Sequence, residues 1–177
     1  MATAADHDRR LTAKSGHSIN HILYYNRYMF HIIEDDEILL EILASMIADA
    51  GYDCLRFKSG DKYMDHLNSP EFECPTAILS DISMPGIHGY DLALETRKRY
   101  PFQKIVLISG TPNEKFDEQA AEQLCYSACK PCEAEKLFAL LTSLTNCEEA
   151  HKTGDKSDYS QSCEFGLDHE CPFHKIN

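Results

Sequence analysis

The sequence predicts an α/β fold, a doubly wound parallel sheet of five strands with helices on both faces, and three observations support this prediction. Short apolar stretches that suit strands alternate along the chain with amphipathic stretches that suit helices. The strand-like stretches show little polar alternation, which is typical of strands buried on both faces of a sheet. Most of them end at a polar side chain, where open α/β sheets place their functional groups.

The elements follow one another in regular order along the chain. The expected strands cover residues 29–33, 52–57, 76–79, 104–108 and 125–129. The expected helices cover residues 38–50, 60–67, 91–100, 113–124 and 133–144. The first helix has the clearest pattern, because its apolar residues recur at three- and four-residue steps before Gly51 ends it. These residues are Ile38, Leu39, Ile42, Leu43, Met46, Ile47 and Ala50.

Composition limits the classes of function. The chain has 177 residues, 43% of them hydrophobic, which is enough for one sizeable core. Its net charge of −12 argues against nucleic acid or an anionic membrane as a partner. We find no apolar stretch long enough to span a membrane and no export signal, so we expect a cytoplasmic protein whose eight cysteines are reduced or bind metal.

The chain divides into three parts by composition. Residues 1–27 mix charged, His and small polar residues, and we expect this N-terminal extension to be mostly disordered. Residues 28–146 hold all the expected strands and helices. Residues 147–177 begin with the composition of a linker, and we expect no DNA-binding or catalytic domain after the first domain.

Polar side chains mark the carboxyl ends of four expected strands. They are Glu34 and Asp35 after the first, Asp81 after the third, Ser109 after the fourth and Lys130 after the fifth. A lone Asp at a strand end would most often cap the next turn. If the strand order is 2-1-3-4-5, however, the first and third strands are neighbours, and the acidic pair shares a crevice with Asp81.

This set of side chains suits a divalent cation and phosphoryl chemistry. Three neighbouring carboxylates raise one another's pKa unless a cation neutralises them, and oxygen ligands favour Mg²⁺. Lys130 adds a positive charge for a phosphoryl oxygen, and Ser109 adds a hydroxyl donor. A carboxylate nucleophile with these groups around it has what attack on a phosphoryl group needs. Asp36 is the alternative acidic residue, although it could simply cap the following helix.

At these motifs the sequence resembles the receiver domain of two-component response regulators, over about residues 28–146. The resemblance rests on Glu34-Asp35, on Asp81 in Asp-Ile-Ser-Met-Pro-Gly-Ile-His-Gly, on Ser109-Gly110 and on Lys130-Pro131. It implies a flavodoxin-like fold with Asp81 as phosphoacceptor and with Ser109 and Lys130 in the catalytic site. It also implies Mg²⁺ held by Asp35, Asp81 and the backbone carbonyl of Ser83, with Glu34 acting through water. The acidic pair could be shifted to Asp35-Asp36.

The resemblance also implies partners and a mode of action. The chain would take a phosphoryl group from a histidine kinase or phosphotransfer protein and signal by conformational change to a separate protein. It would be a switch that catalyses its own phosphorylation and dephosphorylation, not a classical enzyme. The family's usual aromatic residue three positions before the Lys is Ser127 here, and the adjacent Tyr126 should point to the other face of the sheet.

Cysteines raise two further possibilities. Cys129-Lys130-Pro131-Cys132 is a C-x-x-C motif at a strand-to-helix junction, so a thiol–disulfide redox protein is the alternative function. In the C-terminal tail, four side chains could together bind Zn²⁺, or they could belong to an unstructured tail. They are Cys163, His169, Cys171 and His174.

Overall fold

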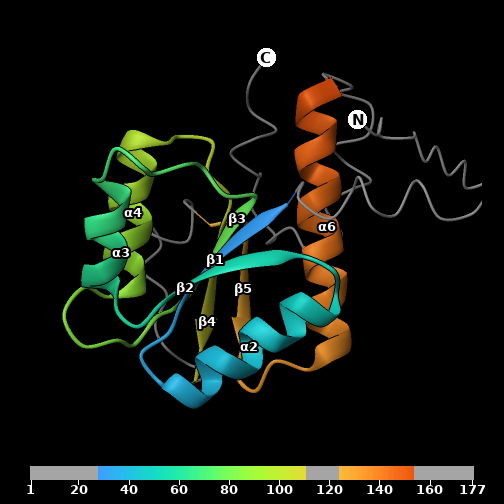
Figure 1. Cartoon of the computed structure of the whole chain (residues 1–177), viewed down its shortest axis with the longest axis horizontal. Helices are drawn as coiled ribbons and strands as arrows, with labels where there is room; N and C mark the ends of the chain where they lie inside the picture. The colour runs from blue at the N-terminus through green and yellow to red at the C-terminus, as the bar shows by residue number, and fades with distance from the viewer. Residues whose placement is uncertain (1–27, 111–123, 154–177) are drawn as a thin grey trace, which may run out of the picture.

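The computed structural model describes residues 28–110 and 124–153 (Figure 1). Its strands are β1 (Met29–Ile33), β2 (Asp53–Phe57), β3 (Ala77–Asp81), β4 (Ile105–Ser109) and β5 (Tyr126–Cys129). Its helices are α2 (Glu37–Asp49), α3 (Gly60–Leu67), α4 (Gly89–Arg99) and α6 (Ala134–Thr153). The N-terminal extension, most of the helix expected over residues 113–124, and residues 154–177 lie outside the described residues.

The five strands form one parallel sheet in the order β2-β1-β3-β4-β5. This is the predicted order, and it makes β1 and β3 neighbours. The chain crosses from one side of β1 to the other after β2, so the carboxyl ends of β1 and β3 flank the switch point of the sheet. β3 and β4 are buried along their whole length.

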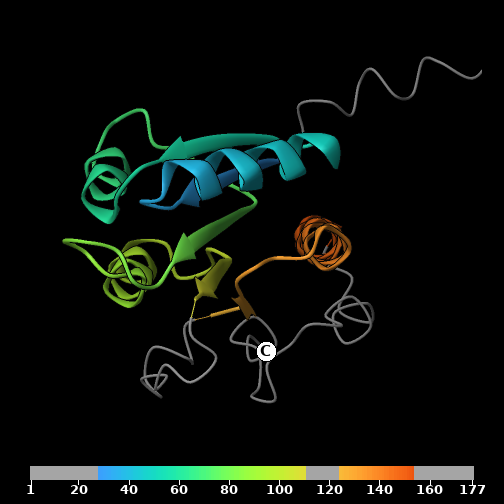
Figure 2. The same ribbon diagram turned by 90° about the horizontal axis from the view of Figure 1, so that it is seen from below.

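Two helical layers cover the sheet. Figure 2 shows α3 and α4 on one side of the sheet and α6 on the other, and α2 buries its apolar residues in the same core as α6. Alternate side chains of each central strand enter opposite cores, as the two-residue period of a strand requires. In β3, for example, Leu79 packs in the core under α2 and α6, whereas Ile78 packs in the core under α3 and α4. Both faces of the central strands are therefore buried, which explains why the sequence shows apolar runs there.

Helix α2 buries a different stripe from the one that the sequence pattern predicts, and only Leu43 and Ile47 belong to both. Its buried residues are Leu40, Leu43, Ala44 and Ile47. Ile38 and Ile42 were expected in the core, but their exposed fractions are 73% and 46%. The prediction was wrong there because more apolar residues are present than one helical stripe can bury. The Asp36 side chain fixes the start of the helix by accepting hydrogen bonds from the Ile38 and Leu39 N–H groups, at 2.8 and 3.1 Å.

Helix α6 runs on to Thr153, past the expected domain boundary at residue 146. Its second half is attached to the sheet by an ion pair between Glu148 and Lys104, the residue just before β4. The Lys104 side chain is only 4% exposed. The polar composition that suggested a linker therefore belongs, up to Thr153, to a helix that closes the amino edge of the sheet. No helix among the described residues is both long and apolar enough to cross a membrane.

Candidate functional site

Two of the predicted acidic residues follow β1 and differ sharply in exposure. Glu34 is only 1% exposed, whereas Asp35 is exposed. Glu34 directly follows the buried end of β1. Its N–H donates to the Phe57 carbonyl at the end of β2. Because Asp36 caps α2, it is committed to the helix, and the acidic pair at this edge is Glu34 and Asp35.

Asp81 is the last residue of β3 and is 5% exposed. Its Oδ1 accepts a hydrogen bond from the Ile82 N–H at 2.8 Å. The start of α4 passes close by, because a Cβ added at Gly89 would lie only 2.3 Å from the Asp81 carbonyl oxygen. Gly89 thus allows α4 to approach the strand end, and its N–H donates to the Ile82 carbonyl at 3.0 Å. The Ile82 N–H therefore holds the carboxylate, while the start of α4 packs against the backbone of the strand end.

Lys130 joins the two buried carboxylates. Its Nζ lies 2.7 Å from Glu34 Oε2 and 3.0 Å from Asp81 Oδ1. Its backbone N–H donates to the Ser109 carbonyl at 2.7 Å, which ties the loop after β5 to the end of β4. Ser109 itself is buried at the end of β4. The predicted groups from four strand ends therefore meet at one edge of the sheet.

Burial and neighbouring charges both affect the pKa values of Glu34 and Lys130, and the pKa of each group is raised. Burial raises the pKa of Glu34, and the nearby Asp81 raises it further, although the hydrogen bond from Lys130 lowers it in part. For Lys130, burial alone would lower the pKa, but its hydrogen bonds to Glu34 and Asp81 outweigh burial and raise it. Lys130 is therefore a firmly held cation that is shared by two carboxylates.

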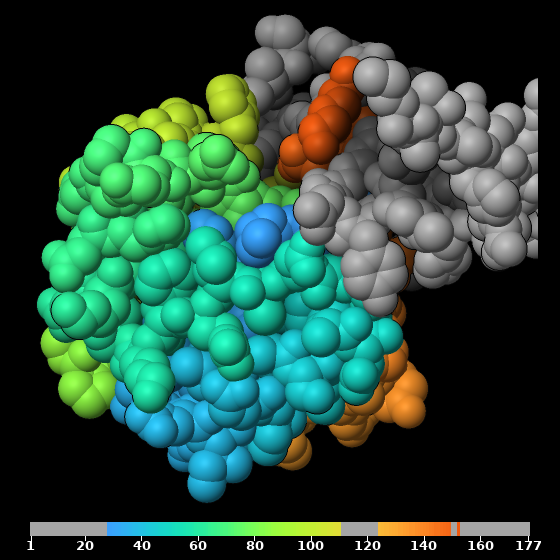
Figure 3. Space-filling model, in the orientation of Figure 1, coloured from blue at the N-terminus to red at the C-terminus, as the bar shows by residue number. Residues whose placement is uncertain are grey.

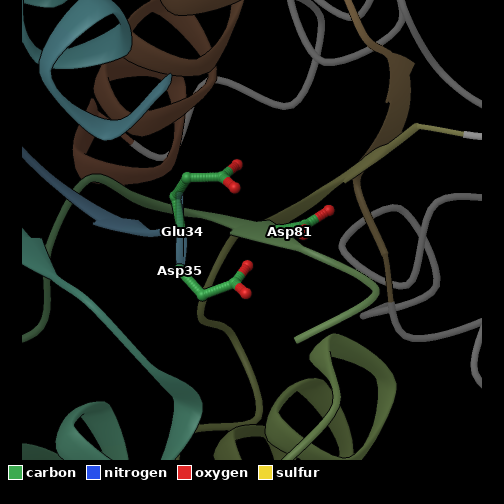
Figure 4. Close-up of side chains that lie close together, drawn as sticks. All are labelled: Glu34, Asp35 and Asp81. Atoms are coloured by element: carbon green, nitrogen blue, oxygen red, sulfur yellow. The ribbon is translucent and has the colours of Figure 1, made fainter. Parts of the chain in front are cut away.

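The same carboxylates suit a divalent cation. Carboxylate oxygens of Glu34, Asp35 and Asp81 lie within 4.8 Å of one another. Figure 4 shows Glu34 and Asp35 coming from the segment after β1 and Asp81 from the end of β3. One Lys cannot balance three carboxylates, and a hard ion with oxygen ligands, such as Mg²⁺, fits the surplus of negative charge. Ser83 is exposed two positions beyond Asp81, in the loop that precedes α4.

Ser127, which stands where the family usually has an aromatic residue, and the adjacent Tyr126 both lie in β5. Tyr126 packs against the core under α2 and α6, on the face of the sheet that the two-residue period predicts. Ser127 is half-buried and pairs in register with Leu107, whose side chain belongs to the opposite core. Ser127 therefore occupies the face toward α3 and α4 without an aromatic ring.

A small cavity beside the site was not predicted. It has a volume of about 130 Å³ and separates α2 from the loop after β5. Its lining residues are Glu34, Leu39, Ile42, Leu43, Met46, Ile108, Lys130, Pro131 and Cys132. No local pattern in the sequence predicts it, because its lining comes from α2, from β4 and from the loop after β5, which only the fold brings together.

Comparisons with known proteins agree with this geometry. The family model described as "Response regulator receiver domain" matches residues 30–142. The DNA-binding transcriptional regulator NtrC of Klebsiella pneumoniae is 27% identical over 111 residues, which are 62% of this chain and 23% of NtrC. FixJ of Bradyrhizobium diazoefficiens, a transcriptional regulatory protein, is 24% identical over 70% of this chain and 60% of its own length. The chain thus spans about a quarter of the NtrC relatives it matches.

Solved structures share the fold. The response regulator TrrA of Thermotoga maritima, determined in complex with Mg²⁺-BeF, has a TM-score of 0.60 and 21% identity over 67% of this chain and 99% of its own. A CheY-like receiver domain from Methylobacillus flagellatus has a TM-score of 0.59 and 21% identity over 66% of this chain and 98% of its own. The predicted flavodoxin-like architecture is confirmed.

The cysteine predictions fare differently. The thiol–disulfide alternative gains no support from these comparisons, and burial raises the pKa of the Cys132 thiol, whereas redox catalysis benefits from a lowered one. The four residues of the expected zinc site lie outside the described residues. They are Cys163, His169, Cys171 and His174.

Proposed function

Because the chain belongs to the response regulator receiver family of two-component systems, we propose that Asp81 accepts a phosphoryl group from a histidine kinase or phosphotransfer protein. The observation that carries this proposal is the shared Lys130 ammonium, 2.7 Å from Glu34 and 3.0 Å from Asp81. Such a group neutralises charge where a phosphoryl oxygen would arrive, and phosphoryl transfer depends on positioning and charge neutralisation.

The reaction is a displacement at phosphorus. An oxygen of the Asp81 carboxylate forms the new P–O bond, the P–N bond to the donor imidazole breaks, and the imidazole nitrogen leaves with the electron pair. Oδ1 of Asp81 already contacts the Ile82 N–H and Lys130 Nζ, so we assign the attack to Oδ2. Lys130 then turns from the carboxylate toward an oxygen of the transferred group, and the Ser109 hydroxyl donates to another.

A magnesium ion is the cofactor that this proposal requires. We assign its ligands to Asp35, Asp81 and the backbone carbonyl of Ser83, with Glu34 acting through water. When bound, Mg²⁺ offsets the negative charge of the phosphoryl oxygens. The close approach of three carboxylate groups, within 4.8 Å, supports this assignment.

The phosphodonor would dock on the exposed apolar side of α2. Ile38 and Ile42 are exposed there, and Ile42 also lines the small cavity next to Lys130. An apolar helix of the donor could cover this surface and exclude water from Asp81 during transfer. Docking at this surface would bury Ile38 and Ile42, which are not buried in the core of the domain.

Output would pass by conformational change to a separate protein partner. The NtrC relatives are named as DNA-binding, but this chain matches only 23% of their length, and its net charge is −12. With Ser127 in place of the usual aromatic residue, the signal must leave the site through other contacts. The hydrogen bond between the Lys130 N–H and the Ser109 carbonyl is one such contact.

The test is labelling with a small phosphodonor such as acetyl phosphate in the presence of Mg²⁺. The parent chain should gain one acid-labile phosphoryl group, and Asp81→Asn should gain none, because an amide cannot serve as the nucleophile. Asp65→Asn, at an exposed position of α3, is the matched control and should label normally. Equal labelling of Asp81→Asn and the parent would overturn the proposal.

A further inference from the structure

Two cysteines flank Lys130 and are not used by the proposed phosphoryl chemistry. Cys129 is the last residue of β5, is exposed, and pairs in register with Ser109. Cys132 is half-buried and lines the small cavity together with Glu34 and Lys130. The Cys132 sulfur lies 3.8 Å from the Cys129 carbonyl oxygen, so the short loop already folds back on itself. The two thiols thus enclose the residue that holds both carboxylates.

We propose that Cys129 and Cys132 form a reversible disulfide that slows phosphoryl acceptance at Asp81. This inference rests on the proposed function. It makes the Cys-Lys-Pro-Cys segment a modification site that controls the neighbouring charge cluster, in place of a redox catalyst.

The geometry explains why the disulfide and the phosphoryl site compete. A disulfide brings the two Cβ atoms to within about 4 Å of each other and imposes its own dihedral angle. Cys132, which lines the cavity, must turn its sulfur from the Cys129 carbonyl oxygen toward the exposed Cys129 thiol. Since Lys130 lies between the two, the movement is transmitted to its backbone, which is tied to the Ser109 carbonyl at 2.7 Å.

The contacts that this loop movement would disturb are short, charge-assisted hydrogen bonds. Lys130 Nζ holds Glu34 at 2.7 Å and Asp81 at 3.0 Å. Such hydrogen bonds weaken steeply when distance or angle changes. A shift of the loop would therefore move the Lys130 ammonium away from Asp81, and we expect the sheet itself to stay folded.

The oxidation step is balanced by a small disulfide such as glutathione disulfide. The two thiols lose two electrons and two protons, one S–S bond forms in the protein, and one S–S bond of the oxidant is broken to give two thiols. A dithiol reductant reverses the step. Burial raises the pKa of the Cys132 thiol, so the exposed Cys129 is the sulfur that meets the oxidant first.

The test compares reduced and glutathione-oxidised full-length chain with acetyl phosphate and Mg²⁺, after peptide mapping of the disulfide. We expect the Cys129–Cys132 disulfide to slow labelling of Asp81 about tenfold, and a dithiol to restore the rate. In Cys132→Ser the rate should no longer respond to oxidant, whereas Cys125→Ser, which removes a half-buried thiol just before β5, should respond as the parent does.

The outcomes separate this inference from the proposed function. Equal labelling rates of the reduced and disulfide-bonded chain, or no Cys129–Cys132 disulfide at equilibrium with glutathione disulfide, would overturn the inference alone. Absence of label in the reduced chain would overturn the proposed function and this inference with it.

Linkage offers an independent measurement. If the disulfide also weakens binding of a phosphoryl analogue at Asp81, the bound analogue must disfavour the disulfide by the factor by which its affinity falls, because linkage is reciprocal for binding equilibria. We expect the affinity for beryllium fluoride with Mg²⁺, a phosphoryl analogue, to be about tenfold lower in the disulfide form. The analogue should then shift the thiol–disulfide equilibrium of the parent about tenfold toward the thiols, or about 30 mV for this two-electron couple. An equilibrium that does not move would contradict the proposed coupling.

Discussion

Each edge of the sheet holds a lysine ion pair, and the two pairs differ in charge balance. At the carboxyl edge, the Lys130 side chain is 19% exposed and serves two buried carboxylates, with Asp35 close by. At the amino edge, the more deeply buried Lys104 pairs with Glu148 of α6. The carboxyl edge has a surplus of negative charge, which suits a divalent cation and the proposed phosphoryl transfer. At the amino edge Lys152 also contacts Glu148 and Glu149, so two lysines balance two carboxylates and attach a helix.

The amino edge also has its own cavity and its own buried histidine. A cavity of about 430 Å³ lies there, lined by residues that include Met29, His31 and Glu148. In Figure 3 the start of β1 lies between β2 and the segment before β3. His31 contacts Tyr63 through its Nδ1, 3.2 Å from the Tyr63 hydroxyl. Burial lowers the pKa of His31 to about 4, and the neighbouring His66 contributes to the shift.

The stability contributions of the two edges should therefore change with pH in opposite directions. The pKa of Glu34 is raised in the folded chain, so its burial as a carboxylate costs stability at neutral pH, and acidification recovers it. The pKa values of His31 and Glu148 are lowered, so both contribute stability that is lost as pH falls. Four predictions test this contrast.

The largest effect should come from breaking the balanced pair. Glu148→Gln leaves the Lys104 ammonium buried without this carboxylate, and we expect the free energy of unfolding to fall by about 4 kcal/mol. Urea unfolding at pH 7 measures it, with Glu149→Gln as control. Phosphorylation of the folded fraction should be unchanged. A loss below about 1 kcal/mol would show that the pair is as weak as an exposed one.

The next largest effect should be a loss of stability on acidification, caused by the lowered pKa of His31. Between its unfolded pKa near 6.5 and its folded pKa of about 4, the unfolded chain binds the extra proton, so stability falls as pH is lowered through this window. The full loss corresponds to about 3 kcal/mol. His31→Gln should flatten the dependence measured by urea unfolding, whereas His88→Gln, at an exposed position, should keep the slope of the parent. Equal slopes in all three proteins would contradict the assignment to His31.

Removing the shared cation should affect reaction more than folding. In Lys130→Met we expect phosphorylation by acetyl phosphate to fall about a hundredfold, the scale of losing one charge-stabilising donor. Stability should change little when Mg²⁺ is present to offset the carboxylates. Rates and unfolding curves measured on the same preparation separate the two effects. A variant that unfolds but reacts normally in its folded fraction would assign Lys130 the structural role of Lys104.

The smallest effect should follow from the exposed carboxylate. Asp35→Asn should weaken Mg²⁺ binding about tenfold, because one oxygen ligand loses its charge. Without Mg²⁺, stability should stay the same or rise slightly, since like-charge repulsion is relieved. Calorimetric titration with Mg²⁺ and thermal unfolding without it give the two values. Unchanged Mg²⁺ affinity would place the ion elsewhere at this edge.

The architecture and the identity of the clustered side chains could be predicted from local sequence patterns. Apolar runs ending at Glu34, Asp81, Ser109 and Lys130 predicted both the parallel sheet and its functional edge, because parallel strands bring their carboxyl ends together. The face occupied by Tyr126 followed from the two-residue period of a strand. These features depend on local periodicity and on chain order, which the sequence contains directly.

Tertiary packing decided what local pattern leaves open. The predicted apolar stripe of α2 contains Ile38 and omits Leu40, and only the position of the sheet put Leu40 in the core and Ile38 at the surface. The end of α6 was misjudged for a similar reason, since the polar residues around Glu148 resemble a linker until Lys104 provides a buried partner. The sharing of Lys130 between two carboxylates likewise depends on distances between strand ends that are far apart in the chain.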